Sequence, residues 1–351
     1  MKIKNALYVQ DIEHATNASL PWEDMLCKHI LITGATGLIG VFLVDCLVYL
    51  NEIRNLNITI TAMARNAETA NACFGHYLSS KTIAFIAHDI NNPIPTNYKY
   101  DYVIHAASNT HPNAYATDPV GTITANVLGT YNLLECIKNI PKSRLLFISS
   151  VEVYGENRGD VEFFNEDYCG YINCNTLRAG YPEAKRVAEA MCQAYIAQYG
   201  VNVVIARLSR TYGATMRLTD SKALSQFILN AVNERDIILK SEGTQKFSYC
   251  YVADAVKGLL HIMLLGKNGE VYNAANDSEN ILLRDIAQIA ATQNGKDVIF
   301  QLPDQTEAKG FSTATTALLN CNKLRKLGWN PHYSMESGIE RTVKMLKDNL
   351  R

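Results

Sequence analysis

A glycine-rich turn between a short apolar run and a longer amphipathic stretch constrains this chain more than any other feature of its sequence. The apolar run covers residues 29–33, and the turn after it reads Gly34-Ala35-Thr36-Gly37-Leu38-Ile39-Gly40. In such a turn the first glycine permits a tight bend, the second lets the backbone approach a pyrophosphate, and the third lets the following helix pack on the strand. The helix N-terminus offers free N–H groups to phosphate oxygens. The turn therefore predicts a dinucleotide-binding unit with these expected contacts: Gly34, Thr36, Gly37, Leu38, Ile39 and Gly40.

Strand-like and helix-like segments alternate along the first 208 residues. Apolar runs occur near residues 58–64, 82–87, 102–106, 145–149 and 201–208, and helical patterns at about 38–52, 119–140 and 184–199. Continuous apolar runs alternating with helices of this length are typical of βαβ units around a buried parallel sheet. We predict an α/β fold, a Rossmann-like doubly wound parallel sheet with a smaller C-terminal α/β lobe for the substrate.

The chain has 351 residues, enough for one large domain or two closely joined ones. The predicted parts are an N-terminal extension at 1–28, a dinucleotide-binding domain at 29–208 and a substrate-binding lobe at 209–351, with 250–275 returning to the dinucleotide-binding domain. We expect one or two short helices within residues 11–25. Beyond residue 208 we expect helices at 220–235, 254–265 and 336–348 and a strand at 236–239.

Composition excludes several classes of protein. Lys plus Arg total 33 and Asp plus Glu total 34, so no strong field attracts nucleic acid or an anionic membrane. The nine cysteines include no C-x-x-C pair, which favours reduced thiols and gives no zinc spacing, so no metal site is expected. The N-terminus has no signal-peptide pattern, and the most apolar run, 38–50, is too short to span a bilayer. We expect a soluble, cytoplasmic protein without nucleic-acid or membrane partners.

The residue after the second predicted strand bears on the choice between NAD and NADP. Folds that bind NAD usually carry an acidic residue there, whereas this sequence has Arg65. Arg65 would pair with the 2′-phosphate of NADP. A solvated loop arginine is an equally weighted alternative, so the expected cofactor is NAD or NADP.

A second motif places a phenol and an amine on one helical face. Tyr181 and Lys185 stand four residues apart in a predicted helix. A phenol with a pKa near 10 acts as a base at neutral pH only when a nearby cation stabilises the phenolate, and Lys185 and an oxidised nicotinamide would supply that charge. Upstream, Ser150 ends a predicted strand where its hydroxyl can meet the tyrosine.

Together these residues resemble the extended short-chain dehydrogenase/reductases, which include nucleotide-sugar epimerases, dehydratases and decarboxylases. The likeness covers roughly residues 28–348 and includes Asp89-Ile90, His105-Ala106-Ala107, Asn126, Ser149-Ser150-Val151-Glu152-Val153-Tyr154-Gly155 and Tyr251-Val252-Ala253-Asp254. It implies that Ser150, Tyr181 and Lys185 form a catalytic triad. The cofactor contacts it implies are Asp89 and Ile90 at the adenine, then Ala106, Ala107, Asn126, Tyr181 and Lys185. His105 is expected to be structural.

Within that family the pattern is closest to UDP-glucuronate decarboxylases and dTDP-glucose 4,6-dehydratases. Glu152 stands where both keep a catalytic glutamate, but the aspartate that dehydratases place before it is Val151 here. The substrate contacts implied by the resemblance are Ser108, Glu152, Arg178, Arg210 and Lys246.

The expected phosphate-binding cations depart from the family pattern. The family's arginine before the aromatic-x-Tyr-Val segment falls at Phe247, beside Lys246, and its asparagine after the sixth strand is Arg210. Where relatives carry a second arginine, this chain reads Phe311-Ser312-Thr313-Ala314. Arg210, Arg217, Lys222 and Lys246 remain as sources of positive charge.

The resemblance implies an enzyme that transiently oxidises a nucleotide sugar at C4, with epimerisation, dehydration or decarboxylation as the next step. Two alternatives stay open: an NADPH-dependent reductase of keto-sugars or other carbonyls, and a non-catalytic dinucleotide sensor. The resemblance also implies a homodimer formed through the helices at about 119–140 and 184–199.

Overall fold

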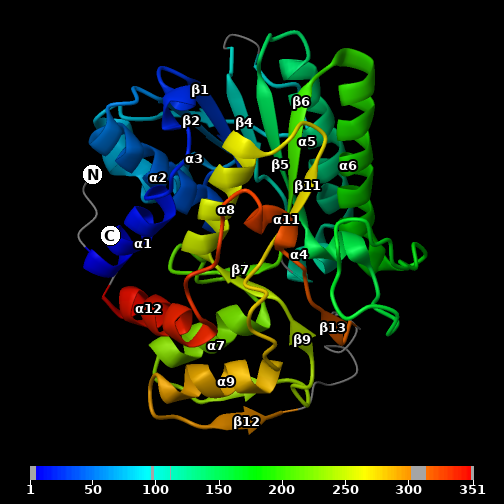
Figure 1. Cartoon of the computed structure of the whole chain (residues 1–351). Coiled ribbons are helices and arrows are strands. Elements are labelled where there is room, and N and C mark those ends of the chain that lie inside the picture. The colour runs from blue at the N-terminus through cyan, green and yellow to red at the C-terminus, as the bar shows by residue number, and fades with distance from the viewer. Residues whose placement is uncertain (1–4, 96–98, 111, 302–313, 349–351) are drawn as a thin grey trace.

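A parallel sheet of seven strands forms the centre of the computed structural model, which describes residues 5–95, 99–110, 112–301 and 314–348 (Figure 1). The strand order is β11-β6-β5-β4-β1-β2-β3, and every pairing within this sheet is parallel. The strands are β1 (His29–Thr33), β2 (Thr59–Ala64), β3 (Ala84–Ala87), β4 (Tyr102–His105), β5 (Arg144–Ser150), β6 (Asn202–Leu208) and β11 (Val271–Ala274). The predicted doubly wound α/β fold is confirmed.

The direction of winding reverses between β1 and β4. From β1 the chain moves outward through β2 and β3, and it then returns to β4 and continues through β5 and β6. The turns after β1 and β4 consequently diverge and leave a crevice at the carboxyl edge of the sheet, which is where open α/β folds bind ligands.

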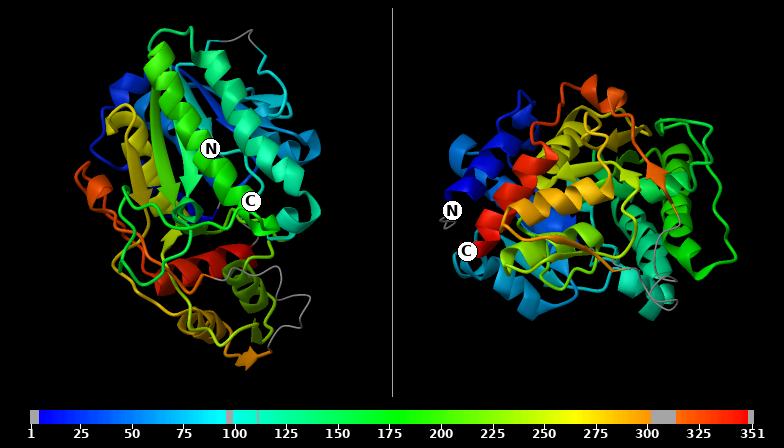
Figure 2. Two further views of the ribbon diagram at one scale, coloured as in Figure 1. Left: turned by 90° about the vertical axis from the view of Figure 1, so that its right-hand side faces the viewer. Right: turned by 90° about the horizontal axis from the view of Figure 1, so that it is seen from below.

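Helices cover both faces of this sheet. On one face α5 (Pro119–Ile137) and α6 (Gly180–Tyr199) pack side by side (Figure 2). On the other face lie α1 (Ala6–Thr16), α2 (Leu38–Arg54), α3 (Ala67–Ser79) and α8 (Val252–Leu265). Strand residues point alternately to the two faces, so Ile30 packs in one apolar core and Leu31 in the other.

A smaller lobe lies beyond the carboxyl edge of the sheet (Figure 1). Its helices are α7 (Ala223–Val232), α9 (Leu283–Thr292) and α12 (Met335–Lys347), with the short α11 (Asn322–Arg325) at the boundary. Two-stranded parallel pairs join β7 (Arg210–Tyr212) with β10 (Tyr249–Tyr251), β8 (Ile237–Leu239) with β12 (Val298–Phe300), and β9 (Lys246–Phe247) with β13 (Thr316–Ala317). The domain boundaries at 28 and 208 stay a prediction, and β11 lies in the central sheet beside β6.

Two buried carboxylates fix the N-terminal segment to the rest of the protein. Asp11, on α1, accepts hydrogen bonds from Tyr251 and pairs with Arg341 of α12 at 2.7 Å. Asp254, on α8, lies 2.8 Å from Nε2 of His14 and accepts two backbone N–H groups, from residues 332 and 333. The predicted short helices within 11–25 are α1, which begins earlier because Asn5 caps it, and a 3₁₀ turn, Trp22–Met25.

No helix in the described ranges has the length and apolar character needed to cross a bilayer. The same residues contain no group of three or more His, Cys, Asp or Glu side chains arranged around a common metal position.

Candidate active site

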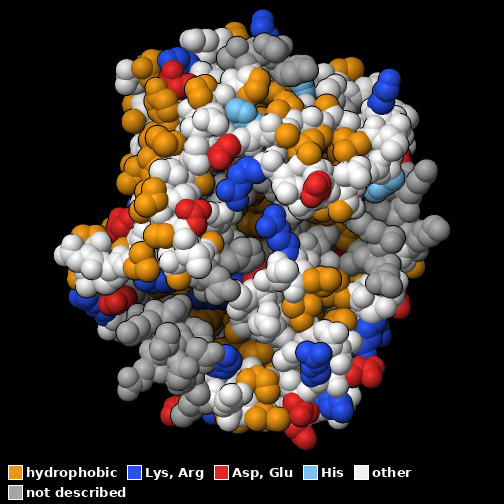
Figure 3. Space-filling view, turned by 180° about the vertical axis from the view of Figure 1, so that it is seen from behind, with side chains coloured by type: hydrophobic (Ala, Val, Ile, Leu, Met, Phe, Trp, Pro, Cys, Tyr) orange, Lys and Arg blue, Asp and Glu red, His pale blue; other side chains and the backbone are white. Residues whose placement is uncertain are grey.

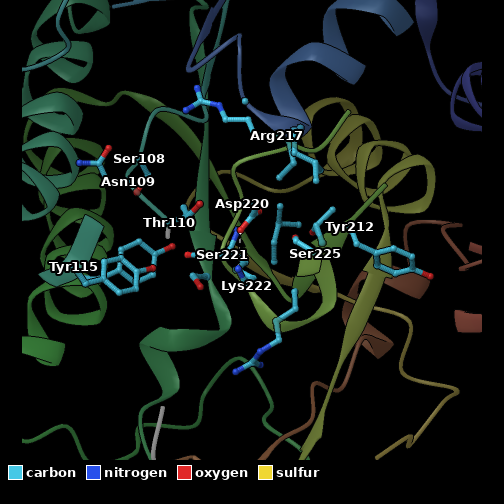
Figure 4. A pocket seen from close by; sticks show the side chains of 18 of the residues that line it. Ser108, Asn109, Thr110, Tyr115, Tyr212, Arg217, Asp220, Ser221, Lys222 and Ser225 are labelled. Carbon is cyan, nitrogen blue, oxygen red and sulfur yellow. Dashed lines mark hydrogen bonds and ion pairs between the residues drawn. The ribbon is translucent and has the colours of Figure 1, made fainter. Parts of the chain in front are cut away.

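A cavity of about 1420 Å³ occupies the crevice at the carboxyl edge of the sheet and extends into the smaller lobe (Figure 4). The face opposite to that of Figure 1 is hollowed near its middle, and Lys and Arg side chains border the hollow (Figure 3). Most predicted site residues line the cavity: Gly34, Thr36, Gly37, Leu38, Ile39, Gly40, Arg65, Asp89, Ile90, Ala106, Ala107, Ser108, Ser150, Glu152, Arg178, Tyr181, Lys185 and Arg210. Asn126 and Lys246 do not.

The turn after β1 can adopt its tight shape only because Gly34 and Gly40 have no side chains. Gly34 has φ +66°, and a Cβ there would lie 2.7 Å from the carbonyl carbon of Ala106 and from Cα of Ala107. A Cβ on Gly40 would lie 2.5 Å from the carbonyl oxygen of Gly34. Gly37 caps α2 without any side-chain hydrogen bond, so the first N–H groups of this helix have no side-chain acceptor there. This cradle fits the diphosphate of a dinucleotide.

The residues predicted at the adenine end line the cavity at the ends of β2 and β3. The carboxylate of Asp89 accepts a hydrogen bond from the N–H of Asn91, and the carbonyl of Ile90 accepts one from Asn132 of α5. Arg65 is exposed and donates to the side chain of Asn109 at 3.4 Å. These contacts hold the loops after β2 and β3 in place beside the cavity.

The three predicted catalytic side chains come together where β5 ends and α6 begins. Nζ of Lys185 donates to the carbonyl oxygen of Ile148 at 2.7 Å, and burial lowers the pKa of this lysine to about 7. Burial raises the pKa of Tyr181 to about 12, while a hydrogen bond with Ser150 acts in the opposite direction. A charged pair made of a phenolate and an ammonium would relieve the cost of both buried charges.

An ion pair and an aromatic stack adjoin the hydroxyl of Tyr181. Glu152 follows β5, in the 3₁₀ turn Val151–Tyr154, and lies 2.8 Å from Nη2 of Arg178. The guanidinium of Arg178 lies 4.8 Å from the ring centre of Tyr115, which itself stacks on Tyr181 at 5.1 Å. Tyr115 belongs to α4 (Pro112–Thr117), and no sequence motif singled it out.

The cationic residues divide into two groups. Arg210 lies on the ring of Phe247, with its guanidinium carbon 3.6 Å from the ring centre, and Arg217 and Lys222 also line the cavity. Lys246 is exposed because neighbouring side chains on β9 point in opposite directions and Phe247 is the one that faces the cavity. The prediction for residues 311–313 lies outside the described residues.

Two further predicted residues are buried behind the cavity wall. Asn126, on α5, accepts a hydrogen bond from the hydroxyl of Ser108 at 3.0 Å, so it reaches the cavity only through that serine. Nδ1 of His105 is 2.9 Å from the hydroxyl of Thr33, and burial lowers the pKa of His105 to about 3. His105 is therefore neutral at physiological pH, and its structural role stays a prediction.

This fold and this site define an enzyme that uses a dinucleotide for oxidation and reduction. The model of the NAD dependent epimerase/dehydratase family matches residues 30–275, and the chain belongs to that family. The family confirms the resemblance and makes NAD the cofactor.

Relatives and solved structures agree with this assignment. The chain is 32% identical over 327 residues to UDP-glucuronic acid decarboxylase 1 of Danio rerio, covering 92% of this chain and 73% of the relative. It is 31% identical to UDP-glucuronic acid decarboxylase 6 of Arabidopsis thaliana, and the match covers 88% of this chain and 86% of the relative. Among structures, dTDP-glucose 4,6-dehydratase from Bacillus anthracis in complex with NAD has a TM-score of 0.77 at 21% identity, covering 92% and 97%. UDP-glucuronic acid 4-epimerase from Bacillus cereus, in complex with UDP-glucuronic acid and NAD, has a TM-score of 0.76 and 23% sequence identity. The match covers 92% of this chain and 99% of that structure. At these identities the structural likeness shows the fold alone.

Proposed function

We propose that this enzyme oxidises the 4-hydroxyl of a nucleotide-linked hexuronic acid, with UDP-glucuronic acid as the first candidate, and decarboxylates the 4-keto acid that results. The observation that carries the proposal is the meeting of Ser150, Tyr181 and Glu152 on one wall of the cavity. The relatives that are UDP-glucuronic acid decarboxylases support decarboxylation over the other outcomes.

The residues present fit NAD. The glycine turn with Ala106 and Ala107 would hold its diphosphate side, and Asp89 and Ile90 would lie at its adenine. When bound, NAD supplies a reversible acceptor for the hydrogen on C4.

The chain's own residues move the protons. Tyr181 takes the proton of the 4-hydroxyl, Ser150 orients that oxygen, and the buried Lys185 stabilises the phenolate. With a ketone at C4, the bond from C5 to the carboxylate carbon breaks, its electron pair passes into the C4–C5 enolate, and CO₂ leaves. We assign to Glu152 the delivery of a solvent proton to C5. Tyr181 then gives its proton back to the C4 oxygen as the hydrogen held by the cofactor would return to C4, which restores the hydroxyl and completes the UDP-pentose.

The nucleotide's diphosphate has cationic partners available in the smaller lobe. Nη1 of Arg210 is buried and has no hydrogen-bond partner among the described residues. Together with Arg217 and Lys222 it gives the cavity a positive end, which supports a diphosphate-linked sugar as the substrate.

The test is to incubate the purified enzyme with NAD and UDP-glucuronic acid and to measure CO₂ and the UDP-pentose by mass spectrometry. Tyr181→Phe is the matched control, because it removes only the hydroxyl. We expect product from the wild type alone. Consumption of NADPH with a keto-sugar and no CO₂ would instead establish the reductase. A bound dinucleotide with no turnover of either substrate would establish the sensor.

The proposed assembly is a homodimer through α5 and α6. Large apolar side chains are exposed on these neighbouring helices: Val120, Ile123, Leu128, Tyr131, Val187 and Tyr199. Light scattering should give twice the 39.0 kDa chain mass. The variant Leu128→Glu should have the mass of a single chain. Leu265→Glu, at an exposed position at the end of α8, should keep the mass of the dimer.

The proposed compartment is the cytoplasm. All nine cysteines are free thiols, and four of them are buried. This supports a reducing environment.

A further inference from the structure

We infer that Arg178 binds the carboxylate of the substrate sugar and so makes the enzyme select an acidic sugar over a neutral one. The inference rests on the proposed function and adds the residue that reads the acid.

Of the two terminal nitrogens of the Arg178 guanidinium, one has a hydrogen-bond partner and the other has none among the described residues. Nη2 pairs with Glu152 at 2.8 Å. Nη1 is buried, yet it has no hydrogen-bond partner in the described part of the chain. A buried donor without a partner is costly, and a charged donor more so, unless a ligand provides the acceptor. The cavity that Arg178 lines is the place from which such an acceptor can come.

Neighbouring residues hold this guanidinium in one orientation. Its guanidinium carbon lies 4.8 Å from the centre of the Tyr115 ring, and Glu152 accepts a hydrogen bond from Nη2. The guanidinium is therefore already oriented, and its remaining N–H groups are available to an acceptor. Arginine binds carboxylates through such pairs of N–H groups on one edge.

The position of Arg178 suits the carboxylate of a hexuronic acid. In such a sugar the carboxylate carbon is only two bonds from C4, whose hydroxyl Tyr181 would deprotonate. Arg178 is three residues before Tyr181, Tyr115 touches both, and the charge of Arg178 is close enough to oppose the effect of burial on the pKa of Tyr181. An anion held by Arg178 would thus lie beside the reacting hydroxyl.

Three other cations of the cavity are less suitable than Arg178, and a fourth, Arg210, rests on the ring of Phe247 and is assigned to the diphosphate. Lys185 already donates to the carbonyl of Ile148, and Lys222 pairs with Asp220. Arg217 and Tyr115 are on opposite sides of the cavity (Figure 4). We assign Lys185 to the phenolate of Tyr181 at the sugar's end of the cavity, and Arg217 and Lys222 to the nucleotide's diphosphate.

Sharing Arg178 has a consequence for turnover. The substrate carboxylate would lie near the carboxylate of Glu152, and the two like charges would repel each other. Breaking the bond from C5 to the carboxylate carbon releases CO₂ and leaves a neutral sugar, so the repulsion disappears along with the contact.

Binding to the NAD-loaded full-length enzyme tests the inference, by calorimetry with UDP-glucuronic acid and with UDP-glucose. The wild type should prefer the acid. Arg178→Gln should weaken binding of the acid by about 10- to 100-fold and alter binding of UDP-glucose by no more than about twofold. Arg178→Lys, which keeps the charge, should retain part of the preference. Arg210→Gln is the matched control and should weaken both ligands equally.

The outcomes separate the inference from the proposed function. If the wild type releases CO₂ but Arg178→Gln and Arg178→Lys keep the full preference for the acid, the assignment of Arg178 is wrong and the function stands. Equal weakening of both ligands by Arg178→Gln also overturns it. A wild type that binds neither ligand overturns both. If Arg178→Gln fails to fold, Arg178→Lys decides.

Discussion

The guanidinium carbon of Arg210 lies 3.6 Å from the centre of the Phe247 ring, so a cation of β7 rests on an aromatic side chain of β9. The resemblance noted in the sequence implies an arginine at about position 247 and an asparagine at 210. In this protein the positive charge has moved to the neighbouring segment, and the aromatic ring now supports it. The cationic end of the cavity depends on that contact.

Replacing Phe247 with alanine should loosen Arg210 and weaken nucleotide-sugar binding. We expect KM to rise about 3- to 10-fold, with kcat nearly unchanged, since a cation–π contact of this kind contributes about 0.5–2 kcal/mol. Steady-state kinetics would measure both constants. Phe300→Ala is the control, because Phe300 is exposed on β12 and does not line the cavity. A fall in kcat alone would contradict the prediction.

Lys185→Met should abolish activity and yet stabilise the protein near neutral pH. Burial lowers the pKa of Lys185 to about 7, below its ordinary 10.5, so the unfolded chain holds more protons than the native state between these values. The free energy of unfolding of the wild type therefore rises with pH between about 7 and 10.5. Below pH 7 Lys185 is charged in both states, so the native protein bears the whole cost of burying that charge.

Urea unfolding at pH 6.5 and pH 9 should show the advantage of Lys185→Met shrinking as pH rises, while kcat is about a thousandfold lower. Lys246→Met, at an exposed lysine, is the control and should match the wild type at both pH values. An advantage for Lys185→Met that grows with pH would refute this account.

Gly34→Ala should prevent NAD binding for a steric reason. The new Cβ would meet backbone atoms of residues 106 and 107 at 2.7 Å, so the turn or the β4 loop must move. We expect NAD affinity to fall by up to about 100-fold, measured by the thermal shift on adding NAD. Gly295→Ala is the control that separates the steric clash with residues 106 and 107 from the strain of placing alanine at a positive φ. Gly295 has the same φ of +66° but open space around its Cβ position, so NAD should still stabilise that variant fully.

Asp11→Ala should destabilise the protein by about 3–5 kcal/mol, because it leaves the guanidinium of Arg341 without its buried partner. Chemical denaturation would give the value. Glu340→Ala removes a carboxylate from an exposed ion pair on α12 and should cost less than about 1 kcal/mol. Similar losses for the two variants would argue against a structural role for α1.

Local sequence patterns predicted the parts of the site that depend on chain spacing. The turn after β1 and the pair Tyr181 and Lys185 are each formed within a few residues of one another, so helix and turn geometry alone places them. Parallel strands buried on both faces are nearly continuous apolar runs, which is why the sheet could be predicted as well.

Contacts made only by tertiary packing could not be predicted in this way. Tyr115 reaches Tyr181 from a short helix 66 residues earlier in the chain, without a motif of its own. Glu152 and Arg178 were each expected near the substrate, but their pairing depends on how the loop between them folds. The exposure of Lys246 depends on which face of β9 turns inward, and a two-residue strand has no periodicity from which to judge that.

Asp254 accepts contacts from His14 and from the backbone at residues 332 and 333, and α1 packs beside α12. Helices α1 and α12, near the two ends of the described residues, are therefore neighbours on one side of the molecule (Figure 1). A chain opened at another loop and joined by a short peptide between α1 and α12 would therefore keep both of these helices in place, since the join would connect two elements that already touch.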